Sequence, residues 1–323
     1  MRVFDQKKTA CLLLSCLFAF LPVIIAVGCN QGDEPVLVNF SKTVPIPHPT
    51  ETAASKEVLR VAVAAMISPK ETFGYYQDLL AYLGDRTGKR VSLVQRKTYA
   101  EINELLQKGL VDIAFICSGP YASGKTLYGL KILAVPQIRG STFYQSYLIV
   151  NKNSPYQTLE DLRGKVFAFT DPESNTGKLV PAFWLSQMGE NPDGFFGKII
   201  YTYSHDNSIL AVSRGLVDGA AVDSLIWDYY DKVNGALTSR TRIIKKSKLF
   251  GIPPLVSSPQ LSETLENEIR NLLYSMHLTS KGKSILDGLM IERFVPSQEE
   301  WYDPIRAMQQ ESRRGKNGKD PTA

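Results

Sequence analysis

Ser174-Asn175-Thr176-Gly177 is a short polar stretch whose residue types suit an anion-binding turn. It follows the apolar run 166–169, which predicts a buried strand, and precedes residues 179–188, whose apolar positions have helical spacing. The first N–H groups of a helix lack partners within the helix, so such a turn offers backbone donors and the positive end of the helix dipole. Gly177 would let a ligand approach the backbone closely. Plain helix capping also explains Ser, Asn and Thr at this place.

Alternating apolar strands and amphipathic helices position this turn. Strands are predicted at 59–65, 91–94, 111–117 and 132–138, and further strands at 199–203, 217–222 and 242–246. This alternation predicts an α/β fold with two lobes, each a mostly parallel sheet covered by helices. We assign 57–147 and 252–311 to the first lobe and 148–251 to the second, with crossings near Tyr147 and Ile252. Ligands of such sheets bind outside the carboxyl ends of the strands, so the cleft between the lobes is the expected site.

Several polar and aromatic residues fall at these strand ends. His205 could donate to an oxyanion, although a lone His is also a common surface or packing residue. Asp223 could accept from a protonated ligand oxygen, orient His205, or simply cap the next helix. Tyr121 and Tyr144 could donate their hydroxyls to a ligand or only pack. The remaining candidates are Ser68, which also caps a helix, and Ser118, which lies in a predicted loop.

The amino-terminal region has the pattern of an export signal. Basic residues precede an apolar run, and Cys29 follows small residues at its end, which resembles a bacterial lipobox. We expect a signal peptide at 1–28 and lipidation of Cys29, with ordinary cleavage or an uncleaved anchor as alternatives. Residues 29–56, which are rich in proline, are read as a tether, and 312–323 as a basic tail.

Composition and missing motifs exclude several classes of function. Loss of the signal removes three basic residues and one acidic residue, so the net charge falls from +5 to +3, too little to indicate nucleic-acid binding. The three histidines have no metal-ligand spacing, and neither a nucleophile elbow nor a phosphate-binding loop is present. Cys117 would remain as a lone thiol, so no disulfide framework is expected. We therefore expect a binding protein without a catalytic residue, metal or cofactor.

Three longer segments resemble the phosphonate/phosphite-type periplasmic binding proteins of ABC importers, which have the type II solute-binding fold. They are VDIAFICSGPY (111–121), SPYQTLEDLRGKVFAFTDPESNTGKLVP (154–181) and YSHDNSILAVSRGLVDGAAVD (203–223). The resemblance implies that the 174–177 turn and His205 contact phosphonate oxygens. Members that bind aminoalkylphosphonates hold the ammonium group with acids, whereas the spacing from His205 leads here to Leu225 and Pro253. The resemblance therefore favours a smaller or uncharged ligand over 2-aminoethylphosphonate.

The expected function is capture of a phosphorus oxyanion, either a phosphonate, phosphite or phosphate, at the extracytoplasmic face of a membrane. The protein would be a monomer held by lipid on Cys29 and would deliver its ligand to an ABC permease. Two alternatives stay open at this point: the same cleft could report to a membrane sensor kinase, or it could bind a different small anion.

Overall fold

The computed structural model describes residues 57–317, apart from the side chains of 69–71, 73 and 313–317. The predicted signal peptide, Cys29 and the whole of the predicted tether lie outside the described residues. None of the helices that the structure describes is long and apolar enough to span a membrane.

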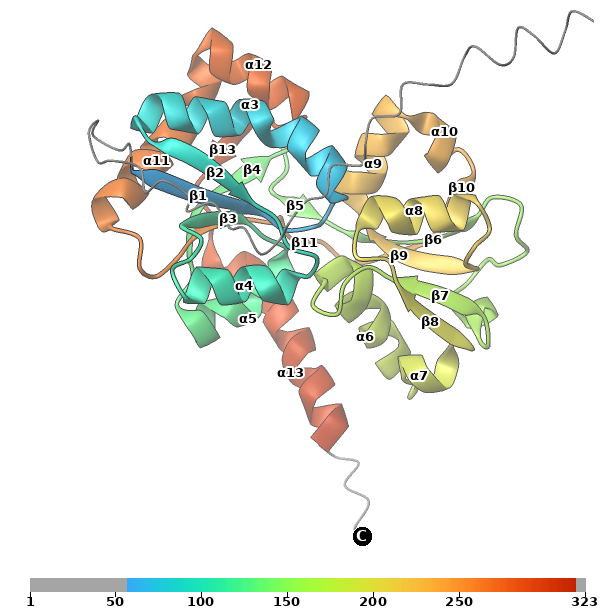
Figure 1. Cartoon of the computed structure of the whole chain (residues 1–323). Helices are drawn as coiled ribbons and strands as arrows, with labels where there is room; N and C mark the ends of the chain where they lie inside the picture. Colours follow the sequence, from blue (N-terminus) through green and yellow to red (C-terminus); the bar gives the residue numbers. More distant parts are fainter. Residues whose placement is uncertain (1–56, 318–323) are drawn as a thin grey trace, which may run out of the picture. The chain divides into compact units, whose positions relative to one another are not determined.

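The first lobe is built on a six-stranded sheet with the order β13-β4-β12-β3-β1-β2 (Figure 1). Its strands are β1 (Val58–Val63), β2 (Arg90–Val94), β3 (Ile113–Phe115), β4 (Lys131–Gln137), β12 (Leu255–Ser257) and β13 (Arg293–Val295). Its helices are α3 (Pro69–Thr87), α4 (Tyr99–Gln107), α5 (Ser118–Tyr128), α11 (Glu263–Ser275), α12 (Ser280–Gly288) and α13 (Asp303–Asn317), with short turns η3 (Met276–Leu278) and η4 (Glu299–Tyr302).

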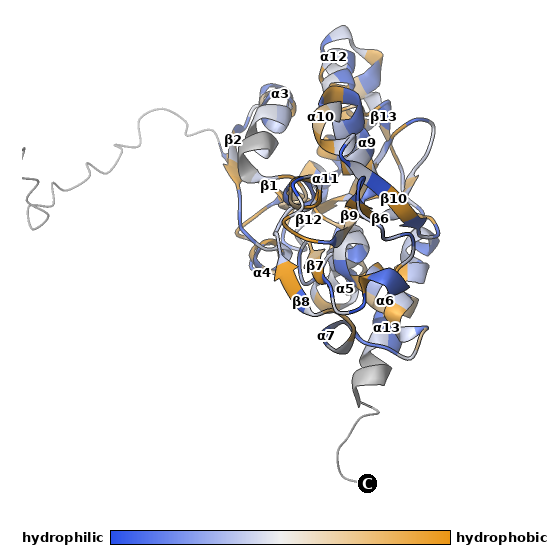
Figure 2. Cartoon of the chain, turned by 90° about the vertical axis from the view of Figure 1, so that its right-hand side faces the viewer, coloured by the Kyte–Doolittle hydropathy of each residue, from blue (hydrophilic) through white to orange (hydrophobic). Residues whose placement is uncertain are grey.

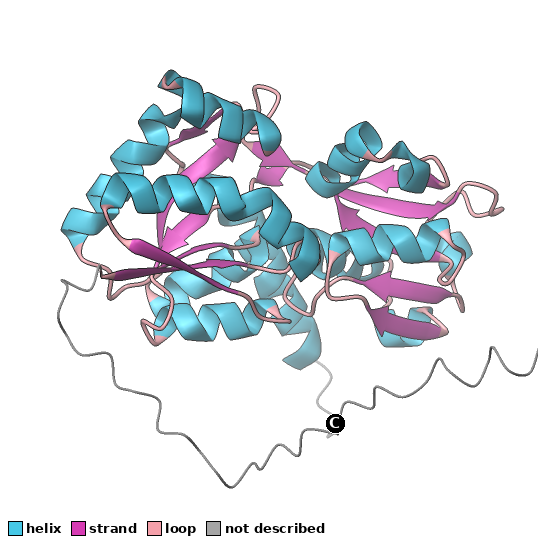
Figure 3. Cartoon of the chain, turned by 45° about the horizontal axis from the view of Figure 1, so that its top comes forward, coloured by secondary structure: helices cyan, strands magenta, loops and turns pink. Residues whose placement is uncertain are grey.

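Two apolar cores cover the two faces of this sheet, because successive side chains of a strand point to opposite sides. Val61 of β1 belongs to the core that packs under α3, α11 and α12. The next residue, Ala62, belongs to the core under α4, α5 and α13. The helices therefore form a layer on each face of the strands (Figure 3).

The second lobe has a five-stranded sheet in the order β10-β6-β9-β7-β8. Its strands are β6 (Ser146–Asn151), β7 (Val166–Phe169), β8 (Lys198–Tyr201), β9 (Gly219–Asp223) and β10 (Thr241–Lys246). Its helical segments are η1 (Glu160–Leu162), η2 (Asn175–Leu179), α6 (Val180–Ser186), α7 (Pro192–Phe195), α8 (His205–Ser213), α9 (Ser224–Val233) and α10 (Gly235–Thr238). The helices carry hydrophilic and hydrophobic residues side by side, as expected for elements with one buried face (Figure 2).

The two crossings between the lobes pair with each other. The short strands β5 (Phe143–Tyr144) and β11 (Phe250–Gly251) form an antiparallel pair close to the predicted crossing positions. After each crossing the chain enters a sheet against the main strand direction: β6 is antiparallel to β9, and β12 is antiparallel to β3 and β4. The predicted two-lobed α/β fold is confirmed, but the expectation of mostly parallel sheets is wrong. Both sheets are mixed, because of these returning strands and because β13 is antiparallel to β4.

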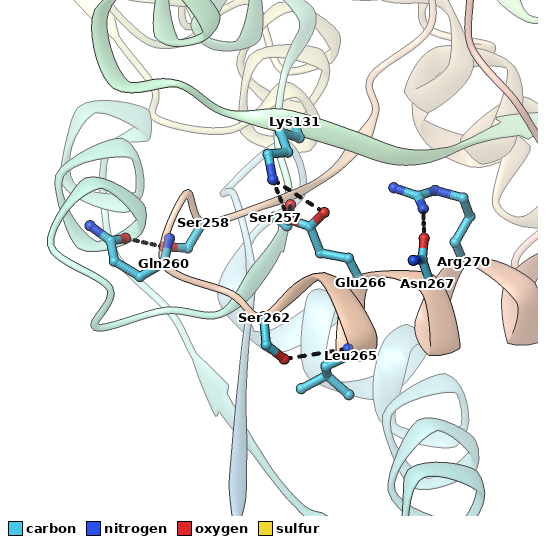
Figure 4. Close-up of polar contacts among 9 residues, drawn as sticks. All are labelled: Lys131, Ser257, Ser258, Gln260, Ser262, Leu265, Glu266, Asn267 and Arg270. Carbon is cyan, nitrogen blue, oxygen red and sulfur yellow. Dashed lines mark hydrogen bonds and ion pairs between the residues drawn. The ribbon is translucent and has the colours of Figure 1, made fainter.

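A buried carboxylate fixes α11 on the first sheet (Figure 4). Glu266 accepts hydrogen bonds from Lys131 of β4 at 3.2 Å and from the hydroxyl of Ser257 of β12 at 2.9 Å. Ser262 caps the same helix by accepting from the N–H of Leu265. These bonds satisfy the carboxylate and the helix start, so the charge can be buried beside the core.

Two predicted boundaries are wrong. Ser118 is predicted to lie in a loop, but it begins α5. Pro120 is tolerated in this helix because it lies in the first turn, where its missing N–H is not needed. The last helix, α13, continues to Asn317 and so enters the stretch expected to be a tail. This helix contacts α5 of the first lobe and α6 of the second, and Gln309 donates to the carbonyl of Gly119 at 3.0 Å.

Candidate functional site

The predicted anion-binding turn begins with a widened, π-helical turn. In η2 the N–H of Leu179 bonds to the carbonyl of Ser174, five residues back, and α6 follows directly. The hydroxyl of Ser174 accepts from the N–H of Gly177 at 3.0 Å, so this serine acts as the helix cap. Turns of this kind are common at functional sites because they redirect side chains within a helix.

Gly177 has a different role from the one expected. A Cβ atom built at Gly177 would lie 2.4 Å from Oγ1 of Thr170 and 3.0 Å from Oγ of Ser174. The missing side chain therefore makes room for Thr170 rather than for a ligand. Its N–H is also engaged by Ser174, so neither the backbone donor nor the space at this residue faces a ligand.

Five buried polar atoms in the described part of this region have no hydrogen-bond partner: Asn175 Oδ1, Thr176 Oγ1, Ser204 Oγ, His205 Nε2 and the hydroxyl of Tyr99. Leaving a buried polar group unpaired costs about 1–3 kcal/mol, so a group of them needs an explanation. The residues come from η2, α4 and the start of α8, and therefore from both lobes. A bound polar ligand would supply the missing partners.

The hydrogen bonds of His205 fix its tautomer. The backbone N–H of Asp223 donates to Nδ1 at 3.1 Å, so Nδ1 is an acceptor and the proton must reside on Nε2. Complete burial lowers the pKa of His205 to about 3, so the ring is neutral at physiological pH. Nε2–H is thus a neutral donor, held in place by Asp223 and Thr170 and left without an acceptor.

Asp223 meets one of its three predicted possibilities in full and a second in part. Its carboxylate accepts from the N–H of Leu225 at 2.7 Å and so caps α9, while its main chain, not its carboxylate, orients His205. Burial raises the pKa of Asp223 to about 7. Near neutral pH this carboxyl is therefore present in both its protonated and its ionised form. Asp223 also lines the cavity described below.

Tyr144 and Asn175 join the two lobes at this point. The Nδ2 atom of Asn175 donates to the hydroxyl of Tyr144 at 3.1 Å. The two ends of an amide are interchangeable by a half turn, and the phenol can donate to the amide oxygen instead. The turned amide would then present its N–H groups where Oδ1 now has no partner.

The other predicted residues have partners elsewhere. Ser118 donates to the carbonyl of Gly251 at 2.7 Å, and the hydroxyl of Tyr121 donates to Glu299 while its ring packs on Tyr302. Ser68 begins α3 without a side-chain cap, although its N–H donates across the lobes to Asp206 at 3.0 Å. Of the predicted set, the structure brings together Asn175, Thr176, His205, Asp223 and Tyr144.

Tyr99 was missed by the sequence reasoning. It lies in a small buried cluster with Ala64, Met66 and Cys117, and burial raises the pKa of its hydroxyl well above the usual value, with the Asp223 carboxyl acting in the same direction. The signal that could have identified it is positional. Tyr99 directly follows the capping residue Thr98 after a strand, which is the same kind of position as the 174–177 turn.

A cavity of about 270 Å³ shares Tyr144 and Asp223 with this site, whereas the five residues with unpartnered atoms do not belong to its wall. Tyr144 and Asp223 belong to its wall, as do Leu225 and Pro253, the residues found where aminoalkylphosphonate binders have acids. The largely apolar cavity is thus connected to the unpartnered groups through two bonds, from Asn175 to Tyr144 and from the N–H of Asp223 to His205.

Comparisons with known proteins agree with this architecture. The profile of the family "ABC transporter, phosphonate, periplasmic substrate-binding protein" matches residues 61–302. The phosphonates-binding periplasmic protein of Escherichia coli (strain K12) is 25% identical over 265 residues, which are 80% of this chain and 78% of that protein. The phosphate-import protein PhnD of Mycolicibacterium smegmatis is 29% identical over 216 residues, or 63% of either chain.

The solved structure of PhnD1 from Prochlorococcus marinus in complex with methylphosphonate has the same fold, with a TM-score of 0.71 at 20% identity over 80% of this chain and 98% of that one. The family consists of substrate-binding components of transporters rather than enzymes. Because its profile matches most of the chain, this protein belongs to the family of periplasmic substrate-binding proteins of phosphonate ABC transporters.

Proposed function

We propose that this protein captures a phosphorus oxyanion in the cleft between its lobes for import by an ABC permease. The observation that carries the proposal is the buried donor at Nε2 of His205, whose tautomer is fixed by the N–H of Asp223 and which has no acceptor. Thr176, Ser204 and Tyr99 add three more buried hydroxyls without partners. An oxyanion with three or four oxygens provides acceptors for all of them.

The protonation state of Asp223 favours a ligand that carries its own proton. With a pKa of about 7, the carboxyl is partly ionised at neutral pH and accepts from a P–OH group without repelling it. Phosphate, phosphite and phosphonates keep such a proton near neutral pH, whereas sulfate does not. We therefore expect discrimination against sulfate.

The energy of capture comes from a few strong hydrogen bonds. Micromolar binding requires about 8 kcal/mol. Hydrogen bonds to a charged ligand contribute about 1.5–3 kcal/mol each, so four or five of them suffice after the costs of association and ordering. The relatives named above are described as binding phosphonates and importing phosphate, which supports the oxyanion class without choosing the member.

The proposal extends to location. We infer that lipidation of Cys29 holds the protein to the extracytoplasmic face of a membrane, with 29–56 as a tether. Metabolic labelling with a palmitate analogue should mark the wild type and not a Cys29→Ser variant. Labelling that persists in the variant would contradict lipidation at this residue.

A thermal-shift screen tests the function directly. The chain from residue 30 onward is heated with phosphite, methylphosphonate, phosphate, 2-aminoethylphosphonate, sulfate or taurine. A ligand at one hundred times its dissociation constant adds about 2.7 kcal/mol to the unfolding free energy, which is readily seen as a shift in Tm. We expect shifts with phosphorus oxyanions and weaker or no shifts with sulfate, taurine and 2-aminoethylphosphonate. If no phosphorus oxyanion raises Tm, the proposed ligand class is wrong.

A further inference from the structure

The cavity beside the oxyanion site is larger than a small oxyanion needs. Its volume is about 270 Å³, whereas a buried apolar cavity of about 150 Å³ already holds a benzene molecule. The hydrogen of phosphite or the methyl group of methylphosphonate would leave most of this space to water. The position is also suitable, because Tyr144 and Asp223 belong both to the cavity wall and to the oxyanion site.

The wall of the cavity is mainly apolar and aromatic. Its side chains include Met66, Phe115, Tyr147, Leu225 and Ile226. Water in such a space makes few hydrogen bonds, so replacing it with hydrocarbon is favourable.

The charged residues of the wall have partners within the protein. Arg139 donates to Asp228 at 3.1 Å, and Asp223 caps α9 through the N–H of Leu225. The first pair leaves no net charge to attract an ammonium group. Leu225 and Pro253 add further uncharged surface next to Asp223.

Both lobes contribute to this wall. Tyr75 of α3 in the first lobe meets Tyr229 of α9 in the second in an edge-to-face contact with ring centroids 5.2 Å apart, and both rings line the cavity. An apolar group in the cavity would therefore touch the two lobes at once. Such a group stabilises the closed arrangement in addition to the contacts of the oxyanion.

We propose that the physiological ligand is a phosphonate whose carbon bears an uncharged apolar group of about four to seven carbons, such as an alkyl chain or a phenyl ring. The inference rests on the proposed oxyanion site and adds a substituent site to it. The sequence resemblance favours a ligand that is smaller than 2-aminoethylphosphonate or lacks its charged amine. This proposal keeps the uncharged substituent but makes it larger. Each buried methylene group should strengthen binding roughly fourfold.

Isothermal titration of the chain from residue 30 onward tests this site with five probes: methylphosphonate, n-butylphosphonate, phenylphosphonate, 2-aminoethylphosphonate and n-butanesulfonate. We expect the butyl and phenyl compounds to bind at least tenfold more tightly than methylphosphonate, and 2-aminoethylphosphonate to bind no better than methylphosphonate. Equal or weaker binding of the two larger apolar compounds, or tightest binding of the amine, would overturn the substituent site.

A matched pair of variants locates the effect. Leu225→Gln places an uncharged polar group of similar length in the cavity wall, and Leu216→Gln makes the same change at a leucine that is 66% exposed. Leu225→Gln should reduce the butyl-to-methyl affinity ratio to threefold or less while changing methylphosphonate affinity by less than threefold. Leu216→Gln should leave both values unchanged. A ratio that survives Leu225→Gln would contradict the assignment of the cavity.

The two proposals fail in different ways. If methylphosphonate binds and the larger compounds do not, the oxyanion site stands and the substituent site is wrong. If n-butanesulfonate binds as tightly as n-butylphosphonate, the apolar site stands and the preference for phosphorus is wrong. If none of the phosphonates or the sulfonate binds, both proposals are wrong.

Discussion

Thr176 has a buried hydroxyl without a partner, which is a cost to the protein before it binds a ligand. Thr176→Val keeps the shape and removes the hydroxyl. We expect the unfolding free energy of the ligand-free protein to rise by about 1 kcal/mol, because an unsatisfied group is removed. We also expect oxyanion affinity to fall by about 10- to 100-fold, because a hydrogen bond to a charged ligand is lost. Urea unfolding and calorimetric titration measure the two changes.

The neighbouring serine supplies the control for this variant. Ser174 already accepts from the N–H of Gly177, so Ser174→Ala should lower stability by about 1 kcal/mol as a lost helix cap. Opposite signs of the stability change at these two adjacent residues would separate a ligand contact from a cap. If Thr176→Val destabilises the ligand-free protein as Ser174→Ala does, Thr176 serves the helix and not the ligand.

His205 is less suitable for such a test. Its Nδ1 atom accepts from the N–H of Asp223, and its ring is fully buried. Truncation to alanine would leave that N–H unpaired and open a cavity, so stability and binding would both fall. Loss of binding in His205→Ala would therefore not by itself identify a ligand contact.

Asp223 gives a pH dependence whose direction is fixed by its raised pKa of about 7. An aspartate in the unfolded chain has a pKa near 4, so between pH 4 and pH 7 the folded protein keeps a proton that the unfolded chain has lost. The stability that this group contributes is therefore complete below about pH 4 and is lost as the pH rises through 7. Asp223→Asn can still accept from the N–H of Leu225 and does not ionise. Its advantage in unfolding free energy over the wild type should grow from pH 4 to pH 7, to on the order of 3 kcal/mol, and then level off.

Urea unfolding at pH 4, 5.5, 7 and 8.5 measures this difference. Asp193→Asn is the control, because Asp193 is exposed on α7. A difference between Asp223→Asn and the wild type that stays constant from pH 4 to 8.5 would show that Asp223 ionises as freely in the folded protein as in the unfolded chain.

At the scale of elements, the sequence predicted most strands and helices because their signals are local. The caps at Thr98 and Ser262 are examples of such local signals, since each needs only a side chain and a backbone N–H a few residues away. The same local information located the strand-to-helix turn at 174–177. It could not show the π-helical first turn, which depends on the packing of η2 against its surroundings.

Gly177 illustrates the limit. From sequence, a glycine in a polar turn suggests close approach of a ligand, but here the space belongs to Thr170, seven residues earlier in the chain. Gly74 in α3 shows the contrast, because a Cβ there would meet nothing within 4 Å. Tyr99 was missed for a related reason. It belongs to the site because α4 contacts the second lobe, and its position after a helix cap does not by itself indicate that contact.

At the scale of the whole binding domain, hydrogen bonds from three main-chain N–H groups cross between the lobes beside the site, in addition to the bond between Asn175 and Tyr144. The N–H of Ser68 donates to Asp206, the N–H of His205 donates to the carbonyl of Met66, and the N–H of Tyr99 donates to Asp171. In two of these bonds a carboxylate of the second lobe accepts from the start of a helix of the first lobe: Ser68 directly precedes α3, and Tyr99 is the first residue of α4. Closure therefore satisfies helix N-termini that would otherwise face solvent.

Asp206 allows this closing contact to be tested without touching the proposed oxyanion donors. Asp206→Ala removes the acceptor for Ser68, so the closed arrangement should become less stable relative to the open one while the fold of each lobe is kept. Affinity for a phosphorus oxyanion should fall about five- to tenfold, corresponding to about 1–1.4 kcal/mol, which is within the usual net contribution of one hydrogen bond.

The loss should be found in the dissociation rate, because the ligand can leave only when the lobes open. Stopped-flow dilution of the complex measures that rate. Asp193→Ala, an exposed acid in the first turn of another helix of the same lobe, should leave it unchanged. A slower association rate with unchanged dissociation would instead mean that Asp206 acts on the encounter with the ligand, and that the contact with Ser68 does not hold the lobes closed.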